Sequence, residues 1–300
     1  MNHVKQAVHY WCSDTMEAIN NGRDVCVAVL DTGLAMHPDF TGRVMDFKDC
    51  VNGRHGLYDD SGHGTHVTGI LAGDGRAYRG VYGGMAPKAR LIIVKVLDEG
   101  GEGSIRQILE GIRWIFQNRL KYGIHVVNLS VGAKTGLEET KENELLQAVE
   151  QLWDAGIAVV VSAGNYGPGE GTVAVPGNSR KVITVGAMGN SKVKNNCSGL
   201  GPTQQCIVKP DLVAPGYQIM SCNADYPKDR RPYVMKSGTS MATPMVAGAI
   251  ALYLSKYPDA GNVEIKLLLR ERCDRAGDKM PFYGWGILNV EKLLKEKEGE

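Results

Sequence analysis

The sequence predicts an α/β fold, in which helices cover both faces of a doubly wound, mainly parallel sheet. Short runs rich in Val and Ile recur along the chain without strict polar alternation, as expected for parallel strands that are buried on both faces. Between these runs, apolar residues recur at helical spacing. Alternation of this kind is typical of a parallel sheet, which presents its functional groups at the carboxyl ends of its strands.

Five strands and several helices follow from this pattern. We expect strands over residues 25–30, 91–97, 125–131, 157–162 and 182–186. A helix that Ser104 can cap should carry the apolar residues between Ile105 and Phe116. A second helix should include Leu145 to Trp153, and a third, almost wholly apolar, should follow Ser240. We expect one domain over residues 1–300, with an N-terminal lead-in (1–24) and a charged C-terminal tail (291–300).

Composition excludes several classes of protein. With 43% hydrophobic and 22% charged residues, the 300-residue chain can bury a large core, and its net charge of +1 predicts no nucleic-acid partner. No apolar run approaches the ~18 residues of a membrane span. The first residues have no apolar segment typical of a signal peptide, so we expect a cytoplasmic protein, or alternatively the mature form of a secreted one. The seven cysteines include no C-x-x-C pair, although Cys197 and Cys206 could bridge a loop.

The first expected strand ends in a carboxylate, in the run VCVAVLDTG that closes with Asp31, Thr32 and Gly33. A second D-x-G run begins at Asp60, and such pairs occur in aspartic proteases. Those enzymes are all-β, and Asp60 does not follow an apolar strand. The alternating strands and helices therefore argue against an aspartic protease.

The second D-x-G run continues into SGHGTHVTG, where His63 lies between two glycines at the start of an apolar helix. His63 and His66 could instead share one helical face and bind zinc. A zinc site would need a third ligand and usually has the pattern H-E-x-x-H, which this segment does not contain. We therefore favour an exposed histidine at a helix start, with space beside it, over a metal ligand.

The third motif, SGTSMATP, places Ser240 at the amino end of the most apolar helix in the chain. Unpaired N–H groups and the positive end of the helix dipole would favour an oxyanion at that point. Ser240 could equally serve only as the helix cap. From this segment alone the two interpretations stay open.

Taken in order, VLDTG, GHGTH and GTSMATP resemble the subtilisin-like serine proteases, the subtilases, and the resemblance extends over residues 25–290. It implies a serine endopeptidase in which Ser240 is the nucleophile, His63 the base and Asp31 the group that orients the histidine. It also implies an oxyanion hole made by the Asn165 side chain and the backbone N–H of Ser240. The resemblance also implies polypeptide substrates, but it does not indicate the oligomeric state.

The resemblance further assigns the substrate-binding segments. Two of them should pair with the substrate backbone as added strands. A third, around Ala174, should form the floor of the main specificity pocket. Because Ala174 is small and no acid is nearby, we expect the substrate to have a large apolar or aromatic residue before the scissile bond (P1). Pro176 resembles a proline that often follows a cis peptide bond. The substrate-binding residues expected are Gly101, Glu102, Gly103, Ser130, Val131, Gly132 and Ala174.

No cofactor is expected to be required. Many relatives bind structural calcium near the position of Asp39, with backbone oxygens of a loop that corresponds to residues 73–84. Arg76 and Arg79 make this loop differ from that pattern, so calcium is allowed but not predicted. Two rival functions are disfavoured. A lipase-type hydrolase would need G-x-S-x-G, which the run GTSMA around Ser240 does not match. An inactive scaffold would not need to keep the residue types of the triad and of Asn165, all of which are present.

Overall fold

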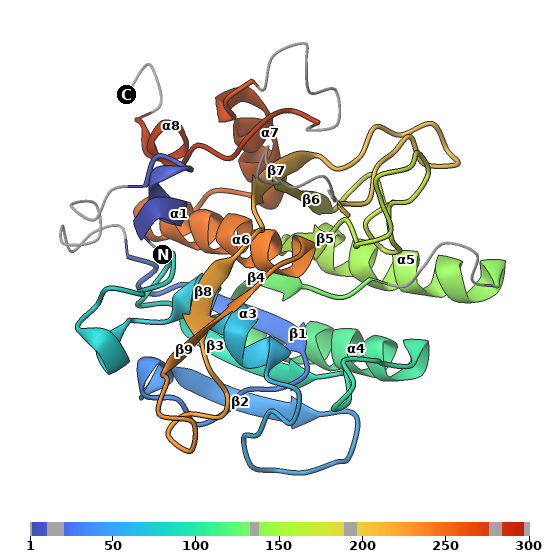
Figure 1. Ribbon diagram of the computed structural model, residues 1–300. Coiled ribbons are helices and arrows are strands. Elements are labelled where there is room, and N and C mark those ends of the chain that lie inside the picture. Colours follow the sequence, from blue (N-terminus) through green and yellow to red (C-terminus); the bar gives the residue numbers. More distant parts are fainter. Residues whose placement is uncertain (1, 11–20, 133–137, 189–196, 276–283, 297–300) are drawn as a thin grey trace.

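A seven-stranded parallel sheet forms the centre of the protein, as the computed structural model shows for residues 2–10, 21–132, 138–188, 197–275 and 284–296 (Figure 1). Its strand order is β2-β3-β1-β4-β5-β6-β7, and a separate antiparallel hairpin is formed by β8 and β9. The strands are β1 (Cys26–Asp31), β2 (Val44–Asp49), β3 (Arg90–Lys95), β4 (Ile124–Leu129), β5 (Ala158–Ser162), β6 (Ile183–Met188), β7 (Leu212–Pro215), β8 (Ile219–Cys222) and β9 (Tyr233–Lys236).

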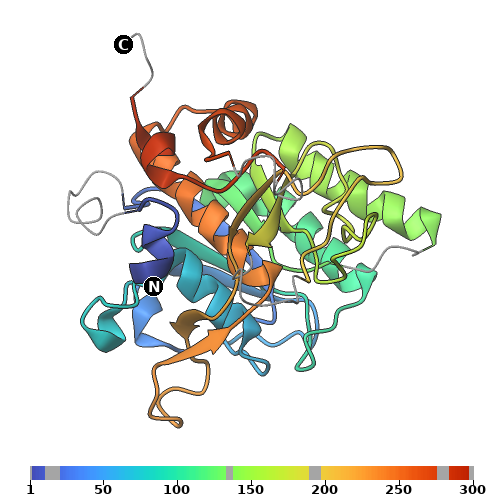
Figure 2. The ribbon, with the colours of Figure 1, turned by 45° about the horizontal axis from the view of Figure 1, so that its top comes forward.

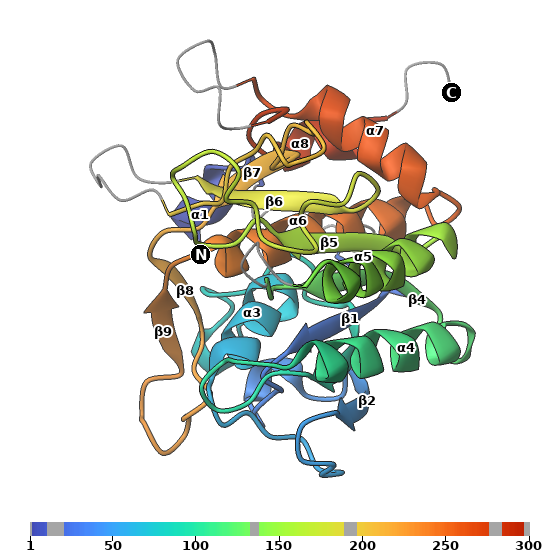
Figure 3. The same ribbon diagram turned by 90° about the vertical axis from the view of Figure 1, so that its right-hand side faces the viewer.

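Helices cover both faces of the sheet, which confirms the predicted fold class (Figure 3). Helices α3 and α6 pack side by side on one face, and α4 and α5 lie together on the other. The helices are α1 (Asn2–Gln6), α3 (His63–Ala72), α4 (Ile105–Tyr122), α5 (Glu139–Asp154), α6 (Thr239–Lys256), α7 (Asn262–Arg272) and α8 (Val290–Leu294), with short 3₁₀ turns at Pro38–Phe40 and Arg76–Tyr78. None of these helices is both long and apolar enough to span a bilayer.

Helix α6 crosses the middle of the molecule (Figure 2). It contacts strands β4 to β7 and also α3, and from Met241 to Leu254 every residue is buried. This explains its sequence, because a helix that is surrounded by protein is apolar on all sides. On the opposite face, Ser104 caps α4 as predicted, through a reciprocal pair of hydrogen bonds with Gln107.

The five predicted strands are all present, and their ends agree with the prediction to within two residues. Four strands were missed. The edge strand β2 mixes polar and apolar residues and is only half-buried, while β7 is four residues long and follows a proline. The hairpin strands β8 and β9 are also four residues each. Strands this short or this polar give no apolar run to recognise.

The strand order brings three chain segments to one place. After β1 the chain forms the edge strand β2, returns to place β3 between β2 and β1, and then adds β4 next to β1 on the other side. The order therefore reverses at β1, and a crevice forms at such a point at the carboxyl ends of the strands. Asp31 ends β1, Ser130 follows β4 and Asn165 follows β5, so all three are directed to this edge.

Candidate active site

Asp31 and His63 form a hydrogen-bonded pair at the end of β1. His63 Nδ1 lies 2.7 Å from Asp31 Oδ1, and the Asp31 side chain is 1% exposed against 26% for His63. The same Oδ1 also accepts a hydrogen bond of 2.8 Å from the N–H of Thr32. Because a carboxylate can only accept, the proton of a neutral His63 must lie on Nδ1, which leaves the lone pair on Nε2. The pair thus sets the tautomer that a general base requires.

The surroundings of His63 act on its pKa in opposite directions. Burial lowers the pKa, whereas the negative charge and hydrogen bond of Asp31 raise it, and the positive charge of Lys236 lowers it again. The net result is a pKa above the ordinary value of 6.5. Asp31 therefore also stabilises the imidazolium that forms when His63 takes up a proton.

Asp59 holds the start of α3 against the end of β1, a role that the sequence analysis missed. Its Oδ1 accepts from Thr32 Oγ1 (2.7 Å), Gly62 N (2.8 Å) and Ser61 N (3.2 Å). Its Oδ2 accepts from Thr65 N (2.8 Å) and Thr65 Oγ1 (2.6 Å). Burial alone would raise the pKa of Asp59, but these hydrogen bonds outweigh it and lower the pKa. One carboxylate thereby fixes the segments that carry Asp31 and His63.

The two segments also touch through backbone. Gly64 N donates to Thr32 Oγ1 (2.8 Å), and a Cβ atom at Gly64 would lie only 2.3 Å from the carbonyl oxygen of Gly33. A side chain at this position would push the helix away from the strand. The glycine after His63 in G-H-G-T-H is therefore required for His63 to approach Asp31.

Ser240 is the second residue of α6, and Gly238 occupies the cap position. The structure thus contradicts the interpretation of Ser240 as a helix cap. Ser240 Oγ donates to the carbonyl oxygen of Ser130 (3.1 Å), and Ser130 Oγ donates in return to the carbonyl of Ser240 (3.3 Å). That carbonyl is available because Pro244, four residues later in the helix, has no N–H to donate. This exchange ties the start of α6 to the segment after β4.

His63 and Ser240 line the same cleft, but the described residues include no hydrogen bond between them. The Ser240 hydroxyl must therefore rotate about its Cα–Cβ bond, away from Ser130, to reach His63. Catalytic hydrogen bonds are often long or unformed before a substrate is bound.

The orientation of the Asn165 amide follows from its partner. Its Oδ1 accepts from Thr239 N (3.0 Å) and Thr239 Oγ1 (3.1 Å). Because a backbone N–H can only donate, the oxygen must face Thr239, and the NH₂ group is left to face the cleft. The N–H of Ser240 lies in the first turn of α6 and has no partner within the helix. Two donors are thus available next to Ser240.

A cleft of about 400 Å³ contains these groups. Of the predicted substrate-binding residues, Gly101, Ser130, Val131 and Gly132 line it, whereas Glu102 and Gly103 are exposed on the same loop but do not. The cleft residues that the sequence analysis did not name are Ser61, Leu97, Gly100, Ser162, Gly164, Tyr166, Lys236 and Thr239.

Ala174 lies below the cleft and is completely buried. Cβ atoms at Gly132 and Gly164 would lie 2.6 and 2.5 Å from its methyl group. These two glycines separate Ala174 from the opening, so Ala174 supports the lining and is not itself exposed in it. The peptide bond between Val175 and Pro176 is cis, as predicted.

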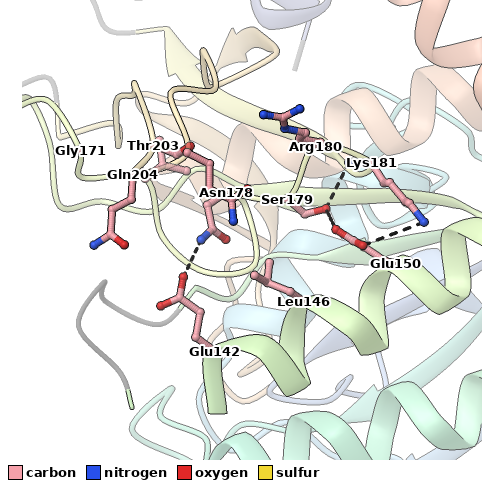
Figure 4. Close-up of a pocket in the computed structure, with 12 residues that line it drawn as sticks. Glu142, Leu146, Glu150, Gly171, Asn178, Ser179, Arg180, Lys181, Thr203 and Gln204 are labelled. Carbon is pink, nitrogen blue, oxygen red and sulfur yellow. Dashed lines mark hydrogen bonds and ion pairs between the residues drawn. The ribbon is translucent and has the colours of Figure 1, made fainter. Parts of the chain in front are cut away.

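A second pocket, of about 240 Å³, lies between α5 and the segment after Pro176 (Figure 4). Two carboxylates from α5 point to this segment: Glu142 Oε1 accepts from Asn178 Nδ2 and Glu150 Oε1 accepts from Ser179 Oγ, both at 2.7 Å (Figure 4). These two hydrogen bonds join α5 to the segment after Pro176. They hold in place the segment that carries Ala174.

The zinc alternative for His63 and His66 does not fit the structure. His66 is fully buried, and its Nε2 lies 3.0 Å from the carbonyl of Ile219 and 3.1 Å from that of Val234. Two acceptors require a proton on Nε2, so this nitrogen points into the hairpin as a donor and not to His63. Burial and the charge of Lys236 lower the pKa of His66 to about 3, so it stays neutral.

The surroundings of Asp39 do not fit a calcium ion either. Its carboxylate, which is fully buried, accepts from Gly75 N (3.0 Å), Ala77 N (3.0 Å), Tyr233 OH (2.9 Å) and Cys222 Sγ (3.5 Å). Calcium needs oxygen ligands, and here donor hydrogens point at the carboxylate where such an ion would lie. His37 Nδ1 lies 3.6 Å from the same carboxylate, and burial raises the pKa of the Cys222 thiol well above its usual value.

The bridge considered between Cys197 and Cys206 is not formed, because Cys206 carries a thiol.

Known proteins are similar to this chain in sequence and in fold. The model of the subtilase family matches residues 22–286. The chain is 40% identical to serine protease AprX of Bacillus subtilis over 94% of its own length and 70% of that protein, and 36% identical to subtilisin DY of Bacillus licheniformis over 90% of each. A cold-adapted subtilisin-like serine proteinase has a similar structure, with a TM-score of 0.74, 29% identity and 90% coverage of both chains. The chain belongs to the subtilase family and is a subtilisin-like serine endopeptidase.

Proposed function

We propose that the protein hydrolyses peptide bonds through Asp31, His63 and Ser240, with an acyl-enzyme intermediate on Ser240. The observation that carries this proposal is the buried pair between Asp31 and His63, whose free Nε2 faces a cleft that also contains the Ser240 hydroxyl. A serine hydroxyl is a weak nucleophile near neutral pH and needs such a base.

The steps follow from the groups present. Ser240 Oγ breaks its hydrogen bond to the carbonyl oxygen of Ser130, gives its proton to His63 Nε2 and attacks the substrate carbonyl carbon. The carbonyl oxygen, now negative, accepts from the Asn165 amide and the N–H of Ser240. His63 then passes the proton to the leaving amine, and the C–N bond breaks. A water molecule, activated by His63 in the same way, releases the acid and restores Ser240. No metal or cofactor takes part in these steps.

We further propose a large apolar or aromatic residue at P1. Ser162, Gly164 and Val131 line the cleft next to Ser240, and the methyl group of Ala174 lies directly below two glycines there. No acidic residue lines the cleft among the described residues, so a basic P1 side chain would find no partner. The substrate backbone would lie between the segments of Gly101 and of Ser130 to Gly132.

Cleavage of a peptide series that differs only at P1 tests both parts. We expect kcat/KM to be higher for Phe or Leu than for Lys or Glu, and we expect Ser240→Ala to abolish detectable cleavage of all four peptides. Ser255→Ala is a matched control, because Ser255 lies at the other end of α6. Equal cleavage by Ser240→Ala and the control would refute the mechanism, and a preference for Lys at P1 would refute the pocket assignment.

A further inference from the structure

Lys236 is a cation in the cleft that the proposed hydrolysis does not use. It is the last residue of β9, and its side chain is partly buried. It lines the same cleft as His63, Ser240 and Asn165. The chain reaches Ser240 only four residues after Lys236, so the position of this side chain is tied to that of the nucleophile.

The carboxylates of Asp31, Asp59 and Asp60 are already bonded to other groups. Asp31 pairs with His63, Asp59 accepts its five hydrogen bonds, and Asp60 pairs with Lys95 at 2.6 Å. Within the described part of the chain, no carboxylate lies within ion-pair distance of Lys236. A partly buried ammonium without a counter-ion favours a ligand that brings a negative charge.

The position of Lys236 decides which part of a substrate meets it. Its Nζ lies 3.9 Å from the place that a Cβ atom at Gly62 would take, and Gly62 directly precedes His63. In the proposed mechanism the leaving amine must lie against His63 to receive its proton. In the proposed mechanism the acyl side of the substrate would lie along the segments of Ser130 and Gly164, which line the same cleft. Lys236 is therefore on the leaving-group side.

We infer that Lys236 selects substrates with an acidic side chain within the first two residues after the scissile bond. The inference rests on the proposed hydrolysis and adds a determinant of substrate choice to it. A carboxylate at that place would pair with the Lys236 ammonium, while a lysine there would be repelled. For a pair that stays in contact with solvent, we expect a roughly fivefold higher kcat/KM for the acidic substrate than for its neutral counterpart.

Lys236 also acts on the proton acceptor. The charged groups that influence His63 are Asp31, Asp59 and Lys236, and only Lys236 opposes the protonation of His63. A bound acidic side chain would neutralise this effect. Replacement of Lys236 by methionine should therefore raise the pKa of His63 and move the acid limb of the kcat/KM profile to higher pH, which a purely structural role of Lys236 would not do.

The test uses three peptides that are identical except for Glu, Gln or Lys at the first residue after the cleaved bond, and a second set varied at the next residue. In each variant the Gln peptide is the internal reference, and mass spectrometry of the products fixes the bond that is cleaved. For the wild type we expect kcat/KM to decrease in the order Glu, Gln, Lys in at least one set. For Lys236→Met we expect equal kcat/KM for the three peptides, and for Lys236→Glu the reverse order. Lys88→Met, which changes an exposed lysine, should behave as the wild type.

Salt gives a second readout, because added salt should reduce the preference of the wild type and leave Lys236→Met unchanged. Equal rates for the three peptides in both wild-type sets, or an unchanged preference in Lys236→Met, would overturn the inference about Lys236 and leave the hydrolytic mechanism intact. Absence of any Ser240-dependent cleavage would instead contradict the mechanism on which the inference rests.

Discussion

Replacement of Asp59 by asparagine should destabilise the protein because this carboxylate joins β1 to α3. Its two oxygens accept five hydrogen bonds, from Thr32, Ser61, Gly62 and Thr65. In Asp59→Asn one oxygen becomes an NH₂ group, which can no longer accept from the backbone N–H and the hydroxyl of Thr65. Hydrogen bonds to a charged group contribute roughly 1.5–3 kcal/mol each, so the loss of two, less the cost of burying a charge, predicts a fall of about 3 kcal/mol in the free energy of unfolding.

The assay is urea unfolding in the Ser240→Ala background, where the protein cannot digest itself. Asp259→Asn is the matched control, since Asp259 is exposed and should change the free energy by less than about 0.5 kcal/mol. In the active background, Asp59→Asn should also lower kcat, because His63 is the first residue of the helix that Asp59 holds. A change in stability no larger than that of the control would refute the view that Asp59 fixes the two segments.

Three further predictions follow from the site. The pKa of His66 is about 3 in the folded protein and near 6.5 once unfolded, so between these pH values only the unfolded chain binds a proton at His66, and stability falls as the pH drops. Between pH 7 and pH 4 the free energy of unfolding of the wild type should fall by about 3 kcal/mol more than that of His66→Gln. Equal losses in the two proteins would contradict this prediction. Asn165→Ala should lower kcat by about 10²–10³ with little change in KM, a magnitude carried over from the same donor in subtilisin and not calculated from this structure; an unchanged kcat would remove Asn165 from the oxyanion hole. Because donors surround Asp39, EDTA should leave the melting temperature of Ser240→Ala unchanged, and a clear decrease that calcium restores would show that the loop binds the ion.

The sequence was sufficient for the parts of the site that short motifs encode. Asp31 follows an apolar strand and His63 begins an apolar helix, so their positions could be read from local pattern, and the structure brings them to 2.7 Å. The central strands were found for the same reason, since burial on both faces produces continuous apolar runs.

Other features depend on contacts between distant segments. Asp59 differs from its neighbour Asp60 in nothing that the sequence shows, yet one accepts five hydrogen bonds and the other pairs with Lys95. Lys236 enters the cleft only because the hairpin of β8 and β9 packs against α3. The donors that surround Asp39 come from the loop at Gly75 and Ala77 and from both hairpin strands. Local patterns contain no information about such pairings.

The most direct measurement of the central mechanism is to label the protein with a fluorophosphonate and to map the modified residue. We expect one adduct, on Ser240, that forms in the wild type and is lost in His63→Ala, because the hydroxyl is reactive only with its base. An adduct on another serine, or equal labelling of Ser240 when His63 is absent, would contradict it.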